Sequence, residues 1–272
     1  MENVNIYQDI KNRTDGDIYI GVVGPVRTGK STFIKKFMEL LVLPNIENGY
    51  KRERAIDELP QSAGGRTIMT TEPKFIPNEA AQITLNDNIT LKTRLVDCVG
   101  YLVNNAIGYM EDEMPRMVKT PWSEQEMPFE TAAELGTRKV IVEHSTVGIV
   151  ITTDGSITDI PREDYVEAEE RVIYELKEMN KPFVILMNCM NPYDSYSISL
   201  AEDLSYKYGT PVIPINCLDL NLEDINDIFS KILYEFAIER INITYPNWID
   251  SLEMNNPVKE SLFSKAKETF LN

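Results

Sequence analysis

Residues 24–31, Gly-Pro-Val-Arg-Thr-Gly-Lys-Ser, decide the fold class. They match the pattern G-x-x-x-x-G-K-[ST] at every fixed position. The apolar stretch Ile18 to Val23 before them predicts a short buried strand. After them, apolar residues at three- and four-residue spacing from Ser31 to Leu43 predict a helix that Pro44 ends. A strand, a glycine-containing loop and a helix in this order predict the start of an α/β domain whose loop binds phosphate.

The residue types in this loop suit phosphate binding. Glycines let the backbone curl so that successive N–H groups point inward, and the helix N-terminus adds positive potential. Lys30 can reach the terminal phosphates of a nucleotide, and the Ser31 hydroxyl can ligate Mg²⁺. We expect a bound nucleotide to contact Gly24, Val26, Arg27, Thr28, Gly29, Lys30, Ser31 and Thr32.

A second motif, D-x-x-G, ends the apolar stretch Ile89 to Asp97 and closes at Gly100. A carboxylate at the end of a strand beside the loop can hold a water of the magnesium shell. The Gly100 N–H group can meet a γ-phosphate and move away when that phosphate leaves. We therefore expect Asp97 to act on the metal side of catalysis and Gly100 to contact nucleotide.

The long polar segment 45–77 predicts a lid over this site. It contains residues 67–73, Thr-Ile-Met-Thr-Thr-Glu-Pro. In switch-type nucleotidases a lid threonine meets Mg²⁺ with its hydroxyl and the γ-phosphate with its backbone N–H. We expect Thr71 to be this catalytic and metal-binding residue, with Thr70 as its neighbour or substitute. The alternative is a solvated turn.

Arg27 occupies a loop position from which its side chain could lie beside the β- and γ-phosphates. An arginine supplied in this way stabilises charge in the transition state. The D-x-x-G motif is followed by Tyr101 instead of the usual Gln, so water must be positioned by the lid threonines or another group. The alternative for Arg27 is that it points to solvent.

The base of the nucleotide is indicated by a missing motif. Guanine-specific relatives carry N-K-x-D after the strand predicted at Phe183 to Asn188, whereas this chain has Asn188-Cys189-Met190-Asn191. An Asn at the Asp position accepts fewer hydrogen bonds from guanine and presents its own donors. Asn216-Cys217 likewise replaces the Ser-Ala turn that packs on guanine. We expect adenine to be favoured, with Asn188 among the residues that contact nucleotide.

The rest of the chain predicts a doubly covered sheet. Residues 82–85 and 89–97 flank a turn triplet and predict an antiparallel hairpin. Three strand-then-helix units follow, which predicts a mostly parallel sheet with helices on both faces. These units are residues 147–153 with 162–179, residues 183–188 with 197–208, and residues 212–216 with 222–239. We expect one domain over residues 1–240, with a long insertion at 101–144, and a C-terminal extension over 241–272.

Two smaller features have structural interpretations. Five glutamates between residues 167 and 178 are expected to form the solvent-exposed side of their helix: Glu167, Glu169, Glu170, Glu175 and Glu178. His144, the single histidine, is expected to be a packing or helix-end residue and not half of a catalytic pair with Glu143.

The composition of the chain disfavours several kinds of partner and site. The chain has 272 residues, with 27 Lys+Arg and 43 Asp+Glu, so its net charge is 27 − 43 = −16. This charge disfavours nucleic acid and bare anionic membrane as partners. Three widely spaced cysteines and one histidine disfavour disulfides and a zinc site. No apolar run reaches the ~18 residues that span a bilayer, so no membrane insertion is expected. We expect a cytoplasmic location.

Several quoted segments together resemble the stage IV sporulation protein A family, the spore-coat morphogenetic ATPases of endospore-forming bacteria. The resemblance rests on residues 24–31, 33–40, 57–63, 67–75, 95–101, 136–140 and 153–155. It implies a P-loop NTPase of translation-factor GTPase type whose base specificity has changed to ATP. It also implies that Lys30 and Ser31 are nucleotide and Mg²⁺ ligands, that Thr70 and Thr71 sense hydrolysis, and that Asp97 is the metal-side acid. The family shares the loss of N-K-x-D.

The resemblance further implies a biological role. Members hydrolyse ATP to drive assembly of a homopolymer, the basement layer of the spore coat, on the forespore surface in the mother-cell cytoplasm. They carry further C-terminal domains that contact spore-coat proteins and a small membrane-bound amphipathic peptide, so this chain is expected to be the ATPase domain alone. Two alternatives stay open: a GTP-binding switch, and a nucleotide-gated scaffold that never hydrolyses.

Overall fold

The computed structural model describes residues 5–60, 73–85, 89–103, 110–111, 114–120, 123–236, 246–249, 251–253 and 255–271. Thr70 and Thr71, at the centre of the expected lid, lie outside the described residues. The chain divides into two compact units, residues 1–236 and 237–272. The first unit holds the sheet and all the motifs discussed above.

A six-stranded sheet with the order β10-β9-β8-β1-β3-β2 forms the centre of the first unit. Its strands are β1 Asp17–Val23, β2 Lys74–Leu85, β3 Ile89–Asp97, β8 Val147–Thr153, β9 Phe183–Asn188 and β10 Val212–Ile215. β1 runs parallel to both of its neighbours, β3 and β8, and only β2 runs antiparallel, at one edge. The predicted mostly parallel sheet with an antiparallel edge hairpin is therefore confirmed, and it fits a P-loop NTPase-like fold.

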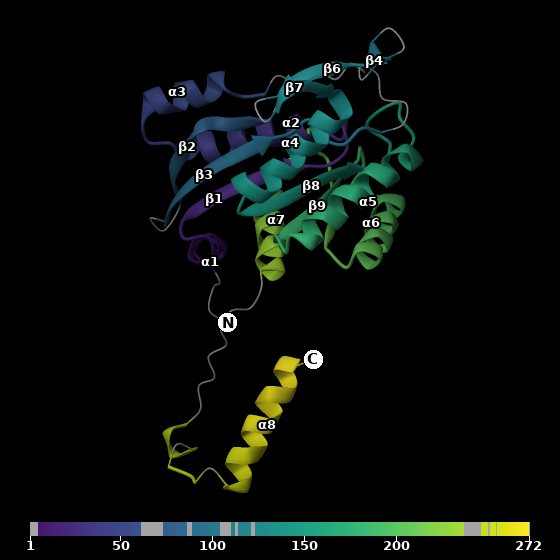
Figure 1. Ribbon diagram of the computed structural model, residues 1–272. Coiled ribbons are helices and arrows are strands. Elements are labelled where there is room, and N and C mark those ends of the chain that lie inside the picture. The colour runs from purple at the N-terminus through teal and green to yellow at the C-terminus, as the bar shows by residue number, and fades with distance from the viewer. Residues whose placement is uncertain are drawn as a thin grey trace. The chain divides into compact units, whose positions relative to one another are not determined.

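Helices cover both faces of this sheet (Figure 1). On one face, α1 (Ile6–Arg13), α2 (Lys30–Phe37) and α7 (Leu222–Glu235) pack on the sheet in one apolar core. On the other face, α4 (Phe129–His144), α5 (Arg162–Glu178) and α6 (Ser195–Tyr208) form a second core. The strands between them, such as β8 and β9, are buried along their whole length, as expected for a sheet covered on both sides.

The segment expected as a lid is partly regular structure. α2 is shorter than predicted and continues as a π-helical turn, Met38–Val42, and a 3₁₀ turn, Leu43–Asn45. α3 (Gly49–Asp57) follows, with the Asn48 side chain accepting a hydrogen bond from the Lys51 N–H as its N-cap. β2 begins already at Lys74. The segment expected as a lid, 45–77, thus contains α3 and the start of β2, and its residues 61–72 lie outside the described part of the chain.

The insertion 101–144 contains two small two-stranded sheets and α4. The strands are β4 Met110–Glu111, β5 Met114–Pro115, β6 Met117–Thr120 and β7 Ser123–Pro128. The helix buries small residues against the sheet, namely Ala132, Ala133, Gly136 and Thr137. His144 ends this helix, and its ring packs edge-on against Phe75 with centroids 5.1 Å apart, which confirms a packing role.

The second unit contains a short 3₁₀ turn, Asn247–Ile249, and one helix, α8 (Pro257–Leu271). Across the described residues of the whole chain, none of the helices combines the length and apolar character needed to span a bilayer.

Candidate nucleotide-binding site

The phosphate loop lies at the carboxyl ends of the central strands. It follows β1, whose two neighbours β3 and β8 belong to different halves of the chain. Ligands of open α/β sheets bind at such a point, where the strand order reverses. Gly100 follows β3, and a parallel bridge between Pro25 and Tyr101 joins the two segments. The topology thus brings both sequence motifs to one place.

The backbone of the loop has a shape that glycine permits. Gly24 has φ +135°, and a Cβ atom added to it would lie 2.3 Å from the Ile151 carbonyl oxygen of β8. Within the loop, the buried Thr28 hydroxyl donates to the Pro25 carbonyl at 3.0 Å. The Thr28 side chain therefore fixes the loop. Arg27 lies near its crest with φ +65°, a conformation uncommon for residues other than glycine.

Lys30 is buried inside this loop. Its Nζ atom donates to the Pro25 carbonyl at 2.6 Å and to the Gly24 carbonyl at 3.4 Å. Burial lowers the pKa of Lys30, while Cys98 and Asp97 act in the opposite direction. Two carbonyl oxygens of the loop thus hold the ammonium group at the place where phosphate oxygens would compete for it.

Ser31 and Asp97 meet beside Lys30. The Ser31 hydroxyl donates to Asp97 Oδ2 at 2.7 Å, and Asp97 Oδ1 is buried without a hydrogen-bond partner. Burial raises the pKa of Asp97 above its ordinary value, although Ser31 and Lys30 oppose this. A partly buried hydroxyl and an unsatisfied carboxylate oxygen are ligands that Mg²⁺ accepts. These residues therefore fit the expected metal, with Thr32 partly buried one position further along α2.

Asn188 connects the loop to the end of β10. Its Nδ2 donates to the Thr28 carbonyl at 3.0 Å, and its Oδ1 accepts from the Cys217 N–H at 3.0 Å. Both ends of the amide are thus engaged within the protein. Asn188 lies at the site and its side chain supports the loop, and the two bonds use one of the two Nδ2 donors and one of the two Oδ1 lone pairs.

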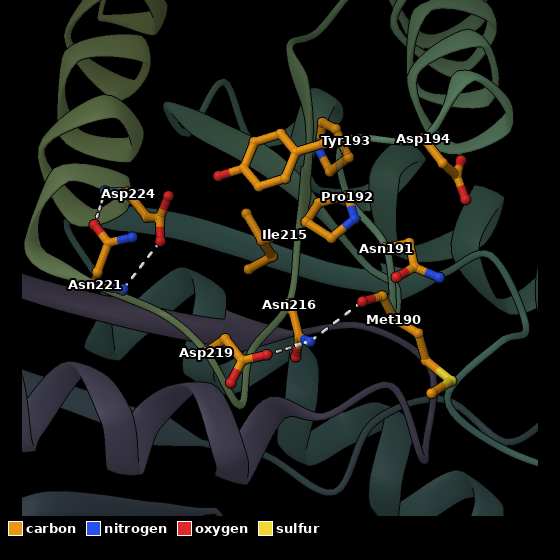
Figure 2. Close-up of a pocket in the computed structure, with 11 residues that line it drawn as sticks. Met190, Asn191, Pro192, Tyr193, Asp194, Ile215, Asn216, Asp219, Asn221 and Asp224 are labelled. Atoms are coloured by element: carbon orange, nitrogen blue, oxygen red, sulfur yellow. Dashed lines mark hydrogen bonds between the residues drawn. The ribbon is translucent and has the colours of Figure 1, made fainter.

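A pocket of about 490 Å³ lies next to these loops, at the carboxyl ends of β9 and β10 (Figure 2). Asn191, Tyr193 and Asp194 line it from the loop that leads to α6. The opposite wall is formed by the residues that lead to α7, where Asn216 Nδ2 donates to Asp219 at 2.8 Å and to the Met190 carbonyl at 3.4 Å. Its lining includes no residue of the phosphate loop, so it is a neighbouring space.

Arg27 lies on the side of the loop that faces α5. Its side chain is partly buried, which lowers the pKa of Arg27, while the nearby Tyr165 of α5 acts in the opposite direction. The Tyr165 hydroxyl is itself 2.9 Å from the Thr158 hydroxyl. Arg27 therefore lies at the loop, and Tyr165 of α5 is one of the groups near its side chain.

Tyr101 was not expected to contact the loop. Its carbonyl accepts from the Val26 N–H at 2.8 Å, and its N–H donates to the Gly24 carbonyl at 3.2 Å. The Val26 amide, expected to face phosphate, is thus engaged by Tyr101 in this structure. The Tyr101 hydroxyl donates to Glu175 of α5 at 2.5 Å. The sequence feature that could have indicated this contact is the aromatic residue Tyr101 at the position after D-x-x-G, where Gln is usual.

A family model described as "Stage IV sporulation protein A, ATPase domain" matches residues 1–237. The chain belongs to this family. The matched region includes the loop, Asp97, Gly100 and the whole sheet, so the family places an ATPase domain on the unit that carries the site.

Curated relatives agree with this family. The chain is 55% identical over 269 residues to stage IV sporulation protein A of Bacillus subtilis (strain 168) and 52% identical over 270 residues to that of Clostridioides difficile (strain 630). Each match covers 99% of this chain and 55% of the relative, so the chain spans about half the length of these relatives. A crystal structure of an SsGBP variant is similar with a TM-score of 0.45 and 16% identity, over 86% of this chain and 65% of that one.

Proposed function

We propose that this chain is a Mg²⁺-dependent ATP hydrolase in which loss of the γ-phosphate changes the shape of the protein. The observation that carries this proposal is the cluster of Lys30, Ser31 and Asp97 around the phosphate loop, with Asp97 Oδ1 left unsatisfied. The name of the family's domain supports ATP as the substrate.

Different residues of the site are proposed to bind phosphate, to bind Mg²⁺ and to sense the γ-phosphate. Lys30 would exchange the loop carbonyls for β- and γ-phosphate oxygens, and backbone N–H groups between Gly24 and Thr32, other than at Pro25, would hold the remaining phosphate oxygens. Ser31, Asp97 and Thr71 would hold Mg²⁺, which neutralises charge on the phosphates when bound. Thr70, Thr71 and Gly100 would report whether the γ-phosphate is present.

Arg27 is the proposed source of positive charge in the transition state. Its place at the crest of the loop, beside the β- and γ-phosphate positions expected from the motif, supports this role. The Arg27→Ala variant is expected to lose on the order of 10³ in turnover while nucleotide affinity changes little. Hydrolysis at the parental rate by Arg27→Ala would dismiss the role.

Adenine is the proposed base. The base end of the site lies toward Asn188 and Cys217, and Asn191 stands where guanine-specific proteins have Asp. The order of the strands, with one antiparallel edge hairpin, supports descent from the translation-factor type of GTPase. We infer that a change in the base-binding loops, and not in the phosphate loop, altered the specificity.

The proposed biological role follows the family. Hydrolysis would drive the protein to assemble with itself into the basement layer of the spore coat, on the forespore surface in the mother-cell cytoplasm. Spore-coat proteins and a small membrane-bound amphipathic peptide would be partners of the full-length protein.

Competition and phosphate release test the proposal. ATP is expected to displace a bound fluorescent nucleotide at lower concentration than GTP, and a preference for GTP would favour a GTP-binding switch instead. Phosphate release is expected from the parent but not from Thr70→Ala/Thr71→Ala, which should still bind nucleotide. Binding without any release by the parent would favour a scaffold that does not hydrolyse.

A further inference from the structure

Tyr101 connects the phosphate loop to the helices on one face of the sheet. Its backbone makes two hydrogen bonds to the loop, at Gly24 and Val26, and its buried side chain reaches α5. Tyr101 thus joins the phosphate loop to the segment after D-x-x-G, in addition to the hydrogen bond between Ser31 and Asp97.

The side chain of Tyr101 is held on two sides. Its hydroxyl donates to Glu175 at 2.5 Å, and the Arg171 guanidinium lies over its ring, 5.3 Å from the centroid. Arg171 is in turn paired through two nitrogen atoms with Glu134 of α4. Burial and Glu175 raise the pKa of Tyr101, so the phenol remains protonated and keeps donating. Hydrogen bonds to an ionised acceptor are among the stronger ones in proteins.

The segment held in this way lies against Lys30 and the phosphate loop. Gly100, with φ +92°, has its ideal Cβ position 2.6 Å from Lys30 Nζ and 2.4 Å from the Gly24 carbonyl oxygen. Gly100 therefore lies directly against the ammonium group that has to reach phosphate. Lys30 meanwhile donates to loop carbonyls, so the loop is satisfied internally. A γ-phosphate has to displace this arrangement.

We propose that Tyr101 is a latch that ties the D-x-x-G segment and the phosphate loop to α5, and that a γ-phosphate opens it by drawing this segment out of place at the cost of the hydrogen bond to Glu175. This inference rests on the proposed function, because it needs a nucleoside triphosphate in the loop. Its consequence is that the presence of the γ-phosphate is read by α5 and, through Arg171 and Glu134, by α4. Part of the binding free energy of the triphosphate is spent on opening the latch, whereas a diphosphate leaves it closed.

The test compares the affinities of a non-hydrolysable ATP analogue and of ADP, each with Mg²⁺, by calorimetry. Tyr101→Phe keeps the ring but removes the hydroxyl, so the analogue is expected to bind about tenfold more tightly while ADP changes by less than about threefold. Glu175→Ala should act in the same direction. The double variant should show no further gain, because both changes remove one hydrogen bond.

Matched controls separate a latch from a stabilising contact. Tyr174, an exposed neighbour on α5 whose hydroxyl bonds to Glu178, provides the control Tyr174→Phe, which should match the parent for both ligands. Glu175→Gln retains an acceptor and should lie between the parent and Glu175→Ala. If both Tyr101→Phe and Glu175→Ala bind analogue and ADP in the parental ratio, the latch is disproved. If the parent binds neither ligand, the proposed function fails and the latch with it.

Discussion

At the scale of single residues, the polar side chains Lys30 and Ser31 of the phosphate loop have hydrogen-bond partners inside the protein. Lys30 donates to carbonyls of its own loop, and Ser31 donates to Asp97. Asp97 Oδ1 is the exception, since it is buried without a partner. Unpaired buried acceptors cost free energy, so the Mg²⁺ ion proposed above would stabilise the site by giving Asp97 Oδ1 a partner.

Asp97 gives a prediction that depends on pH. Because burial raises the pKa of Asp97, its charged form is disfavoured in the folded protein, and this cost is present above the raised pKa and absent below the ordinary value. Without Mg²⁺, Asp97→Asn is therefore expected to increase the free energy of unfolding near neutral pH, and the increase should vanish as the pH falls toward the ordinary pKa of an Asp.

Urea unfolding across pH, without Mg²⁺, measures this effect. Asp227→Asn is the control, because Asp227 lies half-exposed in a surface pair with Lys231. It should show no gain at neutral pH. A loss of stability at neutral pH in Asp97→Asn would contradict the account of this carboxyl. Mg²⁺-ATP should stabilise the parent far more than Asp97→Asn.

The sequence could predict which motif residues come together, because each motif combines a local pattern with a strand end. Lys30, Ser31, Asp97 and Gly100 do lie side by side. The contacts of Tyr101 could not be predicted, since Glu175 is 74 residues away in the sequence and belongs to a helix whose polar residues all indicated exposure. The double engagement of Asn188 was equally hidden, because it depends on the backbone of two distant loops.

At the scale of elements, apolar periodicity predicted the central strands and the helices α5, α6 and α7. It failed for α1, α3 and α4. α1 and α3 are mostly polar, and their buried residues are Ile10 and Ala55. α4 buries alanines, a glycine and a threonine between Phe129 at its start and Val140 and Ile141 near its end, which gives a weak hydrophobic pattern. Tertiary packing, and not local sequence, determines these three helices.

In helix α5, one glutamate, Glu169, differs from the expected exposed position. Glu169 was expected on the exposed face but is fully buried, where it pairs with Arg162 at 2.7 Å and accepts hydrogen bonds from Thr152 and Tyr208. Five glutamates on one helix predicted a solvent-exposed face, but the Glu169 side chain lies on the face of α5 that contacts β8 and α6. The carboxylate connects a strand and two helices.

Glu169→Ala is expected to lower the free energy of unfolding by about 3–5 kcal/mol, because the mostly buried guanidinium of Arg162 would lose its partner. The adjacent Glu170→Ala is the control. Glu170 pairs with Lys207 on the surface, and its removal should cost less than about 1 kcal/mol. Chemical denaturation of both variants checks this. Equal losses would show that the buried network contributes nothing beyond a surface pair.

At the scale of the whole molecule, the division of the chain and the match to the family coincide. The compact unit ends at Phe236 and the family model ends at residue 237. The sheet, both cores and the loop belong to this unit. The net charge of −16 does not prevent phosphate binding, because backbone amides and one buried ammonium group act locally.

Removal of residues 237–272 is therefore expected to leave the fold of the first unit intact. The shortened chain should unfold within about 2 °C of the parental midpoint and bind nucleotide with unchanged affinity, because no residue of the candidate site lies beyond residue 236. Thermal denaturation followed by circular dichroism checks this expectation. A shortened chain that precipitates or loses its cooperative transition would show that the second unit completes the core.

The most direct test of the central claim is a calorimetric titration of Mg²⁺-ATP into the parent and into Lys30→Ala. The account predicts saturable binding by the parent and no detectable binding by Lys30→Ala, because the ammonium group that would hold the β- and γ-phosphates is lost. No uptake of any nucleoside triphosphate by the folded parent would contradict it.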